Sequence, residues 1–285
     1  MSKPTAFLVV GLPHAGVPQL LASLDQHRDS LGDIGVRLPA RFADEAFRAA
    51  VELRREHRAW GLRRRDVEGA WAEICRRATK HRDTVVIGHE LLAGASPDEI
   101  ALAVDALSGH RVHVVVVAGP PDPLAGLIPS ELDLADVVAR WQSAVKTPDR
   151  LHVLVASAGP APAWSALGEL VGFDAEELPL VGEPAGGQLD AHTLGLLAES
   201  TAALLDHDEL LELAEHWAKQ IADSGYDVRG DLAELTPARP TGDVPLAVLR
   251  GVLAESVAEI GRLRARVAEL ETSAAARRPR RRSAT

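Results

Sequence analysis

The chain has 285 residues, of which 46% are hydrophobic and 25% are charged, proportions that are ordinary for a globular protein. Its formal net charge of -10 argues against a generic nucleic-acid binder. Cys75 is the only cysteine, so no intrachain disulfide can form and a cytoplasmic setting is expected. No segment approaches the roughly 18 consecutive apolar residues of a membrane span, and the apolar run near the start is too short for a signal peptide.

Four valine-rich runs predict buried strands of a parallel sheet, because they lack the polar alternation of a half-exposed strand. These runs are Ala6–Val10, Thr84–Gly88, Arg111–Ala118 and Leu151–Ser157. The segment "GVRLP" at 35–39 predicts a fifth, shorter strand. Helical patterns lie between the runs, and this alternation predicts an α/β fold: a P-loop NTPase-like parallel sheet flanked by helices, with a helical C-terminal part and a long terminal helix.

The predicted helices follow the strands in chain order. Those of the first half are Val17–Leu31, Phe42–His57, Asp66–His81 and Pro97–Leu107. Ser96 is the expected N-cap of the last of these, with Glu99 three residues later in the pattern of a capping box. The second half should hold a helix that ends near Gly172, followed by Leu189–Leu205 and Glu209–Ser224. We therefore predict one α/β domain over residues 1–237.

Residues 238–271 combine a turn-rich linker with a heptad pattern. Leu246, Leu249, Leu253, Ser256, Ile260, Leu263, Val267 and Leu270 are spaced alternately by three and four. This pattern is typical of a helix that lies on the domain and equally of a coiled coil that makes a homo-oligomer through residues 246–270. Gly251 and Gly261 each weaken an isolated helix by about 1 kcal/mol. The remaining tail, 272–285, is expected to be disordered, and Arg277–Arg282 is the only segment for which weak contact with nucleic acid is expected.

A glycine-bracketed turn joins the first strand to the first helix. Gly11 and Gly16 have the spacing of a phosphate-binding loop, in which inward N–H groups and the positive helix end hold an anion. The NTPase form of this loop continues with lysine and a serine or threonine. This chain has Val17 and Pro18 at those two positions, which argues against hydrolysis of ATP or GTP with magnesium.

The stretch "GLPHAGVPQL" resembles the phosphosulfate loop of sulfotransferases, typically G-x-P-K-T-G-T-T-x-L, and matches it at Gly11, Pro13, Gly16 and Leu20. Three further stretches, "DTVVIGHELLAGASPDEI", "DRLHVLVASAGPAPAWSALGELVGFDAEEL" and "GYDVRGDLAELTP", resemble the bacterial sulfotransferase-like family. The similarity covers most of residues 5–237 and rests on the order of these segments.

This resemblance implies a P-loop-type fold, 3′-phosphoadenosine-5′-phosphosulfate (PAPS) as the donor, and transfer of its sulfonyl group to a hydroxyl or amine of a small-molecule acceptor without a metal. The loop that would bind the donor comprises Gly11, Leu12, Pro13, His14, Ala15, Gly16, Val17 and Pro18. By the same resemblance His89 would be the general base, with Glu90 orienting it or acting in its place. The alternative is a histidine that is hydrogen-bonded at the start of a helix, with Glu90 solvated.

The chain departs from the family pattern where charge is needed. His14 replaces the loop lysine, and Ala15, Val17 and Pro18 replace threonines. Where the family has an arginine for the 3′-phosphate this chain reads "AGPPD" at 118–122, although Ser130 could be the serine that follows it. Two hypotheses therefore stay open: a sulfotransferase with impaired activity, or a non-catalytic binding or assembly module that uses its terminal helix.

Other polar groups could change this assessment. Arg37, Arg41 or Lys146 could restore the missing charge if the fold brought one of them into the crevice. His110 and His113 lie three apart and should point to opposite faces of a strand, so a metal site is not expected there.

Overall fold

The structure is a computed structural model, and it describes residues 3–12, 15–80, 82–121, 133–156, 159–182 and 207–237. All of these residues belong to one compact unit. The predicted helix at 189–205, the linker with the heptad pattern, the arginine-rich tail, Pro13, His14 and Ser130 lie outside the described residues.

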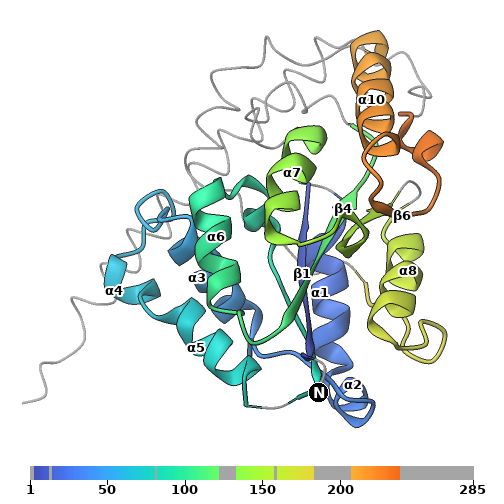
Figure 1. Cartoon of the computed structure of the whole chain (residues 1–285). Coiled ribbons are helices and arrows are strands. Elements are labelled where there is room, and N and C mark those ends of the chain that lie inside the picture. The colour runs from blue at the N-terminus through green and yellow to red at the C-terminus, as the bar shows by residue number, and fades with distance from the viewer. Residues whose placement is uncertain are drawn as a thin grey trace, which may run out of the picture. The chain divides into compact units, whose positions relative to one another are not determined.

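The described unit is built on a six-stranded, all-parallel sheet in the order β2-β3-β1-β4-β5-β6 (Figure 1). The strands are β1 Thr5–Gly11, β2 Val36–Arg37, β3 Thr84–Gly88, β4 Arg111–Ala118, β5 Leu151–Val155 and β6 Asp227–Arg229. The α/β class and the parallel sheet are thus confirmed. The four predicted runs form the four central strands, and the "GVRLP" segment forms the short edge strand β2.

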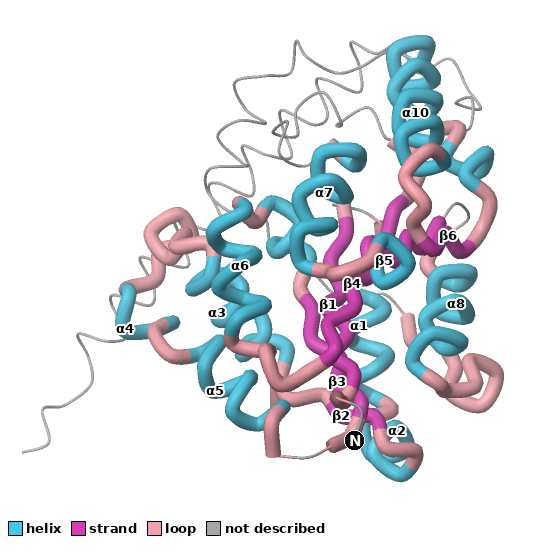
Figure 2. Tube along the Cα trace, viewed as in Figure 1, coloured by secondary structure: helices cyan, strands magenta, loops and turns pink. Residues whose placement is uncertain are grey.

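Helices cover both faces of the sheet, which is why the central strands are continuous apolar runs. Figures 1 and 2 show α6 and α7 on one face and α1 and α8 on the other. The longer helices are α1 Val17–Gln26, α3 Ala43–Leu53, α5 Ala70–Ala78, α6 Pro97–Asp105, α7 Leu134–Trp141, α8 Ala161–Val171 and α10 His207–Ala222. Shorter helices and 3-10 turns are α2 Arg28–Asp33, α4 Arg64–Val67, η1 Glu90–Gly94, η4 Gln142–Ala144, η5 Pro148–Arg150 and η7 Leu232–Leu235.

Two predicted helices are each divided in the structure. The helix predicted over 66–81 breaks at Gly69, whose φ of 88° is left-handed. There the carboxylate of Glu52, on α3, accepts hydrogen bonds from the N–H groups of Gly69 and Trp71 at 2.6 and 2.8 Å. It thereby caps α5 from a neighbouring helix, a tertiary contact that local periodicity does not show. The helix predicted over 17–31 breaks at His27, which separates α1 from α2.

Other local features follow the sequence closely. Ser96 and Glu99 form the predicted capping box at the start of α6. On the same face, α10 is tied to the start of α7, because the indole N–H of Trp217 donates to the Asp133 carboxylate at 2.7 Å. Among the described helices, none is long and apolar enough to cross a membrane.

Candidate functional site

The strand order places a topological switch point, the expected position of a ligand crevice, beside the loop that follows β1. The chain leaving β1 runs toward the β2 edge of the sheet, whereas the chain leaving the adjacent strand β4 runs toward β5. Ligands of open parallel sheets bind at such a reversal, outside the carboxyl ends of the strands. The loop Gly11–Gly16, His89 and the "AGPP" segment at 118–121 all follow strands at this edge.

The described ends of the loop, Gly11–Leu12 and Ala15–Gly16, have backbone positions that require glycine. Gly16 begins α1 with a left-handed φ of 84°, a conformation that favours glycine. A Cβ atom on Gly11 would lie 2.5 Å from a methyl carbon of Val17 and 2.7 Å from the Val117 carbonyl oxygen, so only glycine fits there. Pro18 stands in the first turn of α1, where its missing N–H is not needed.

Part of the loop backbone is already hydrogen-bonded within the protein. The Leu12 N–H donates to the Val117 carbonyl, and the Ala15 N–H donates to the Leu12 carbonyl, both at 3.2 Å. These two donors therefore face β4 and the turn itself. An anion in the crevice would have to be held by other N–H groups of the loop and by the positive end of α1.

Segments after β4 and β5 pack closely on the loop. A Cβ atom on Gly16 would come within 2.8 Å of the Pro160 Cβ, and one on Gly119 would lie 3.9 Å from the Ala15 Cα. The surrounding residues Leu12, Ala15, Ala118 and Ala156 are all buried. These described neighbours of the loop are apolar, and His89 and Glu90 follow β3 at the same edge of the sheet.

His89 begins η1 and is bonded to the main chain on two sides. Its own N–H donates to the Val9 carbonyl, and its ring Nδ1 accepts the Leu91 N–H, both at 3.2 Å. The ring also lies 5.7 Å from the ring of Phe47, measured between centroids. Burial lowers the pKa of His89 to about 4, so the imidazole is neutral at pH 7.

The hydrogen bond to Nδ1 sets the tautomer of this neutral ring. Because Nδ1 accepts, the proton resides on Nε2, and the ring presents an N–H donor rather than a lone pair. This geometry favours the interpretation of His89 as a histidine that caps a helical turn. The general-base role of His89 and Glu90 stays a prediction, and it requires the ring to release the Leu91 N–H or Glu90 to accept the proton instead.

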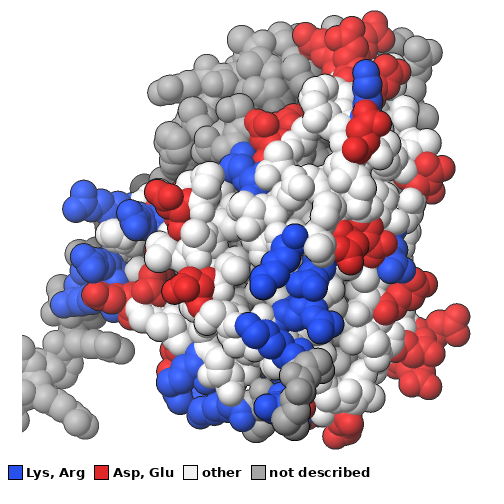
Figure 3. Space-filling model, in the orientation of Figure 1, with Lys and Arg blue, Asp and Glu red and all other residues white. Residues whose placement is uncertain are grey.

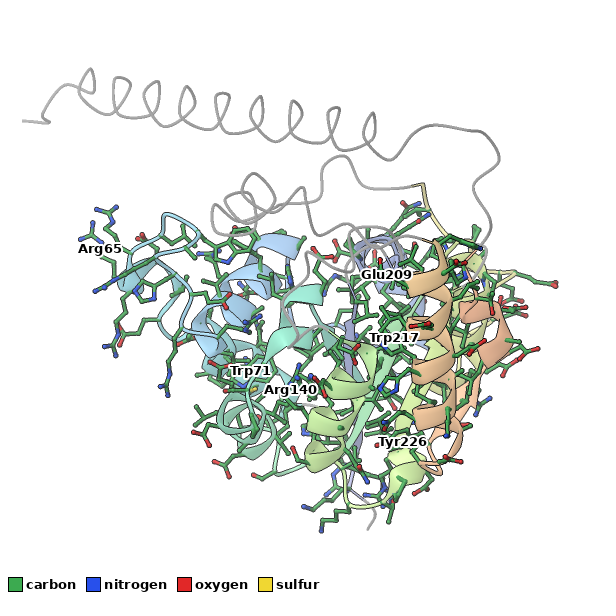
Figure 4. The ribbon with its side chains drawn as sticks, turned by 90° about the horizontal axis from the view of Figure 1, so that it is seen from above. Arg65, Trp71, Arg140, Glu209, Trp217 and Tyr226 are labelled. Atoms are coloured by element: carbon green, nitrogen blue, oxygen red, sulfur yellow. The ribbon has the colours of Figure 1, made fainter. Side chains whose placement is uncertain are left out.

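Two arginines and a tryptophan hold the turn that follows His89. Arg54, from the end of α3, donates to the Leu91 carbonyl at 3.0 Å. Arg140, from α7, donates to the carbonyls of Ala93 and Ala95 at 3.1 and 3.3 Å (Figure 4). The Trp141 indole N–H donates to the Leu92 carbonyl at 3.1 Å. Both arginines are thus bound to main-chain oxygens of residues 91–95, and Arg54 is also paired with Glu56.

The three cations that could have restored the missing charge lie elsewhere. Arg37 is paired with Asp83 at 2.8 Å, level with the amino end of β3. Lys146 precedes β5 and borders a pocket at the amino ends of the strands. Arg41 acts electrostatically on Glu45 and Glu73, on α3 and α5. The described part of the chain therefore brings none of the three to the loop.

A partly buried row of hydrogen-bonded side chains that the sequence did not predict crosses the other end of the sheet. His113 Nδ1 lies 2.9 Å from His152 Nε2, and His152 Nδ1 lies 2.7 Å from an Asp227 carboxylate oxygen. Burial, with the nearby charges of His152, Arg150 and Arg111, lowers the pKa of His113 to about 4. Burial works to raise the pKa of Asp227, but hydrogen bonds from His152 and Arg229 bring it below its ordinary value.

These three side chains come from β4, β5 and β6. The sequence could not predict their contact, because it depends on the register of the strands and on the presence of β6. His113 pairs with His152 on its own face of the sheet, and His110 is not part of this row of hydrogen-bonded side chains. Within the described ranges, no group of three or more His, Cys, Asp or Glu side chains could hold a metal ion. Burial raises the pKa of Cys75 to about 12, which leaves its thiol unreactive.

Comparisons with protein-family models, curated proteins and solved structures find no significant match to this chain.

Proposed function

We propose that this chain is a sulfotransferase-like protein with a P-loop-like fold whose donor site is impaired, so that it binds PAPS weakly and transfers a sulfonyl group slowly or not at all. The observation that carries this proposal is that two arginines close to the turn after His89 already bind main-chain oxygens. Arg54 and Arg140 are bound to main-chain carbonyls of residues 91–95. The family's lysine is replaced by His14, and its arginine after β4 by a proline-rich segment.

Electrostatics explain why this matters for both binding and catalysis. PAPS is a polyanion, and a desolvated anion needs paired charge or several hydrogen bonds. The end of a helix contributes only about 0.3–1 kcal/mol to an exposed anion. Loss of one donor that stabilises developing charge costs about 2.7–4 kcal/mol, or about 10²–10³ in rate. His14, Val17 and Pro18 together replace one cation and two hydroxyl groups, so we expect the loss to be larger than for a single donor.

The proposal keeps the loop as the place where an anion would bind, because its turn and helix start have the required shape. Gly11 and Gly16 are both fixed by geometry, and α1 points its positive end at the turn. What has changed is the set of side chains, which can be put back. This makes restoration the sharpest test of the proposal.

The test is the triple variant His14→Lys, Val17→Thr, Pro18→Thr. The control is His14→Gln, Val17→Ala, Pro18→Ala, which alters the same positions without adding charge or hydroxyl groups. Both are titrated with 3′-phosphoadenosine-5′-phosphate while the thermal midpoint is followed. A ligand at 100 times its dissociation constant adds about 2.7 kcal/mol of stability. We expect a larger gain in the restored variant than in the control, because binding elsewhere on the protein would affect both variants alike. Equal gains, or no gain in either folded variant at millimolar ligand, would contradict the proposed loop site.

A further inference from the structure

A second pocket lies at the opposite end of the strands from the loop. It has a volume of about 480 Å³ and is lined by residues before β1 and β5, at the end of α6 and just after it, and at the start of β4. Among them are Lys3, Arg111, Lys146 and Arg150. The strand register explains this gathering, because Arg111 pairs with Thr5 at the start of β1, and β5 begins beside Val114 of β4. Three segments that are distant in sequence thus bring four cations to one edge.

These four cations are only partly balanced by carboxylates, since the charge of Arg150 helps to lower the pKa of Asp149. None of them forms an ion pair with another residue of the described part of the chain. Asp105 is the one carboxylate among the lining residues. Lys3 donates to the Ser108 carbonyl at 2.7 Å. Figure 3 shows Lys and Arg side chains gathered in the lower centre of this face, over the amino end of β4 in Figure 1.

The charge of this edge is opposite to that of the whole chain, which is -10. A compact group of cations repels itself, and it is stabilised when an anion binds among them. The positive charge of this edge also acts on a nearby half-buried side chain, because Arg111 and Arg150 both help to lower the pKa of His113. Burial is the larger cause of that shift, so the histidine supports the placement of the two arginines and no more.

The wall of the pocket restricts what kind of anion fits. Leu107, Val112 and Ala144 are buried apolar residues that line it, and Val104 adds a half-buried one. A volume of about 480 Å³ lies within the roughly 300–1,000 Å³ of pockets for small organic ligands. Inorganic phosphate would leave the apolar wall unoccupied. An uncharged apolar molecule would leave the cations unpaired.

We propose that this pocket binds a small organic phosphate, with its apolar body against Val104, Val112 and Ala144 and its phosphate group between Arg111, Lys146 and Arg150. A phosphomonoester carries close to two negative charges at neutral pH, and guanidinium groups bind phosphate oxygens bidentately. The site is separate from the donor loop, which lies at the carboxyl ends of the same strands. It does not depend on whether PAPS binds there.

The test uses the full-length protein and isothermal titration calorimetry with 1-naphthyl phosphate, inorganic phosphate and 1-naphthol. We expect 1-naphthyl phosphate to bind at least tenfold more tightly than either of the other two, and its affinity to fall as salt is raised. Replacement of two cations by Arg111→Gln and Lys146→Gln should weaken its binding at least tenfold. The variant His14→Gln, in the donor loop, should leave its binding unchanged.

The matched control is Arg64→Gln with Arg65→Gln, which removes the same charge from exposed side chains of α4. Arg65 lies at the far edge of the molecule (Figure 4). The single variant Lys146→Gln, in an exposed loop, serves if the double variant does not fold. Absence of binding at millimolar 1-naphthyl phosphate would overturn the proposal. So would equal binding of 1-naphthol, or equal weakening by the α4 control.

Discussion

Pro160, immediately before α8, lies over Gly16, where α1 begins, so closely that a Cβ atom on Gly16 would come within 2.8 Å of the proline Cβ. The contact joins the loop after β1 to the segment after β5, across the switch point of the sheet. It shows that the turn is held both by its own backbone and by a neighbouring segment. The start of α1 is therefore held in place independently of the side chains at positions 14, 17 and 18.

Gly16→Ala should be more destabilising than an alanine at another left-handed helix start. At Gly16 the φ of 84° costs about 1–2 kcal/mol for a non-glycine residue, and the new methyl group meets Pro160 as well. Gly69 is the matched control, since its φ of 88° begins α5 with open space around it. Urea unfolding should show a larger loss of free energy for Gly16→Ala. Equal losses in the two variants would contradict the proposed contact.

Trp141 should stabilise the fold through its hydrogen bond as well as its ring. Trp141→Phe leaves the Leu92 carbonyl without the indole donor, which costs about 1–3 kcal/mol in a buried site, in addition to the lost volume. Trp71→Phe is the control, because Trp71 is also buried and its indole N–H has no partner in the described part of the chain. Chemical unfolding should give the larger loss for Trp141→Phe. A reversed order would show that the bond to η1 contributes little.

Stability should fall as the pH drops from 6.5 toward 4, because of His89. Its pKa in the folded state is about 4, lowered by burial, whereas that of the unfolded chain is close to 6.5. The unfolded state therefore binds more protons in this window, and at pH 5 the loss amounts to about 2 kcal/mol. His113, whose pKa is also lowered, adds to the same trend.

The variant His89→Asn isolates the contribution of this one ring. Asparagine keeps an acceptor for the Leu91 N–H but does not titrate. Urea unfolding between pH 7 and 4.5 should give a shallower pH dependence in the variant than in the unchanged protein. Equal slopes would mean that the pKa of His89 is the same in the folded and unfolded states, which would contradict the burial of its neutral ring.

The sequence predicted the parts of the fold that depend on local pattern. Buried valine runs identified the central strands, and Ser96 with Glu99 marked the start of α6. It did not predict the break at Gly69, which depends on a carboxylate from α3, or the three-residue strand β6, which is too short to have a period. In the candidate site, too, some features depend on local sequence and others on tertiary contacts. The loop and the turn at His89 follow from local residues, whereas the bonds from Arg54 and Arg140 depend on how the helices pack.

The heptad pattern lies outside the described residues, so its role stays a prediction. If residues 246–270 form a coiled coil between copies, deletion of residues 244–285 should lower the solution mass to that of a single chain. Light scattering after size-exclusion chromatography measures this directly. If the intact protein is itself a single chain in solution, the coiled-coil interpretation is wrong and the helix-on-domain interpretation remains.

The measurement that tests the central claim most directly is the dissociation constant of 3′-phosphoadenosine-5′-phosphate for the unaltered protein, determined by isothermal titration calorimetry. Because His14, Val17 and Pro18 supply neither the lysine nor the hydroxyl groups, and Arg54 and Arg140 are bound to carbonyl oxygens, we predict no saturable binding in the crevice below millimolar ligand. Micromolar binding that His14→Gln abolishes would show a working donor site and contradict the account.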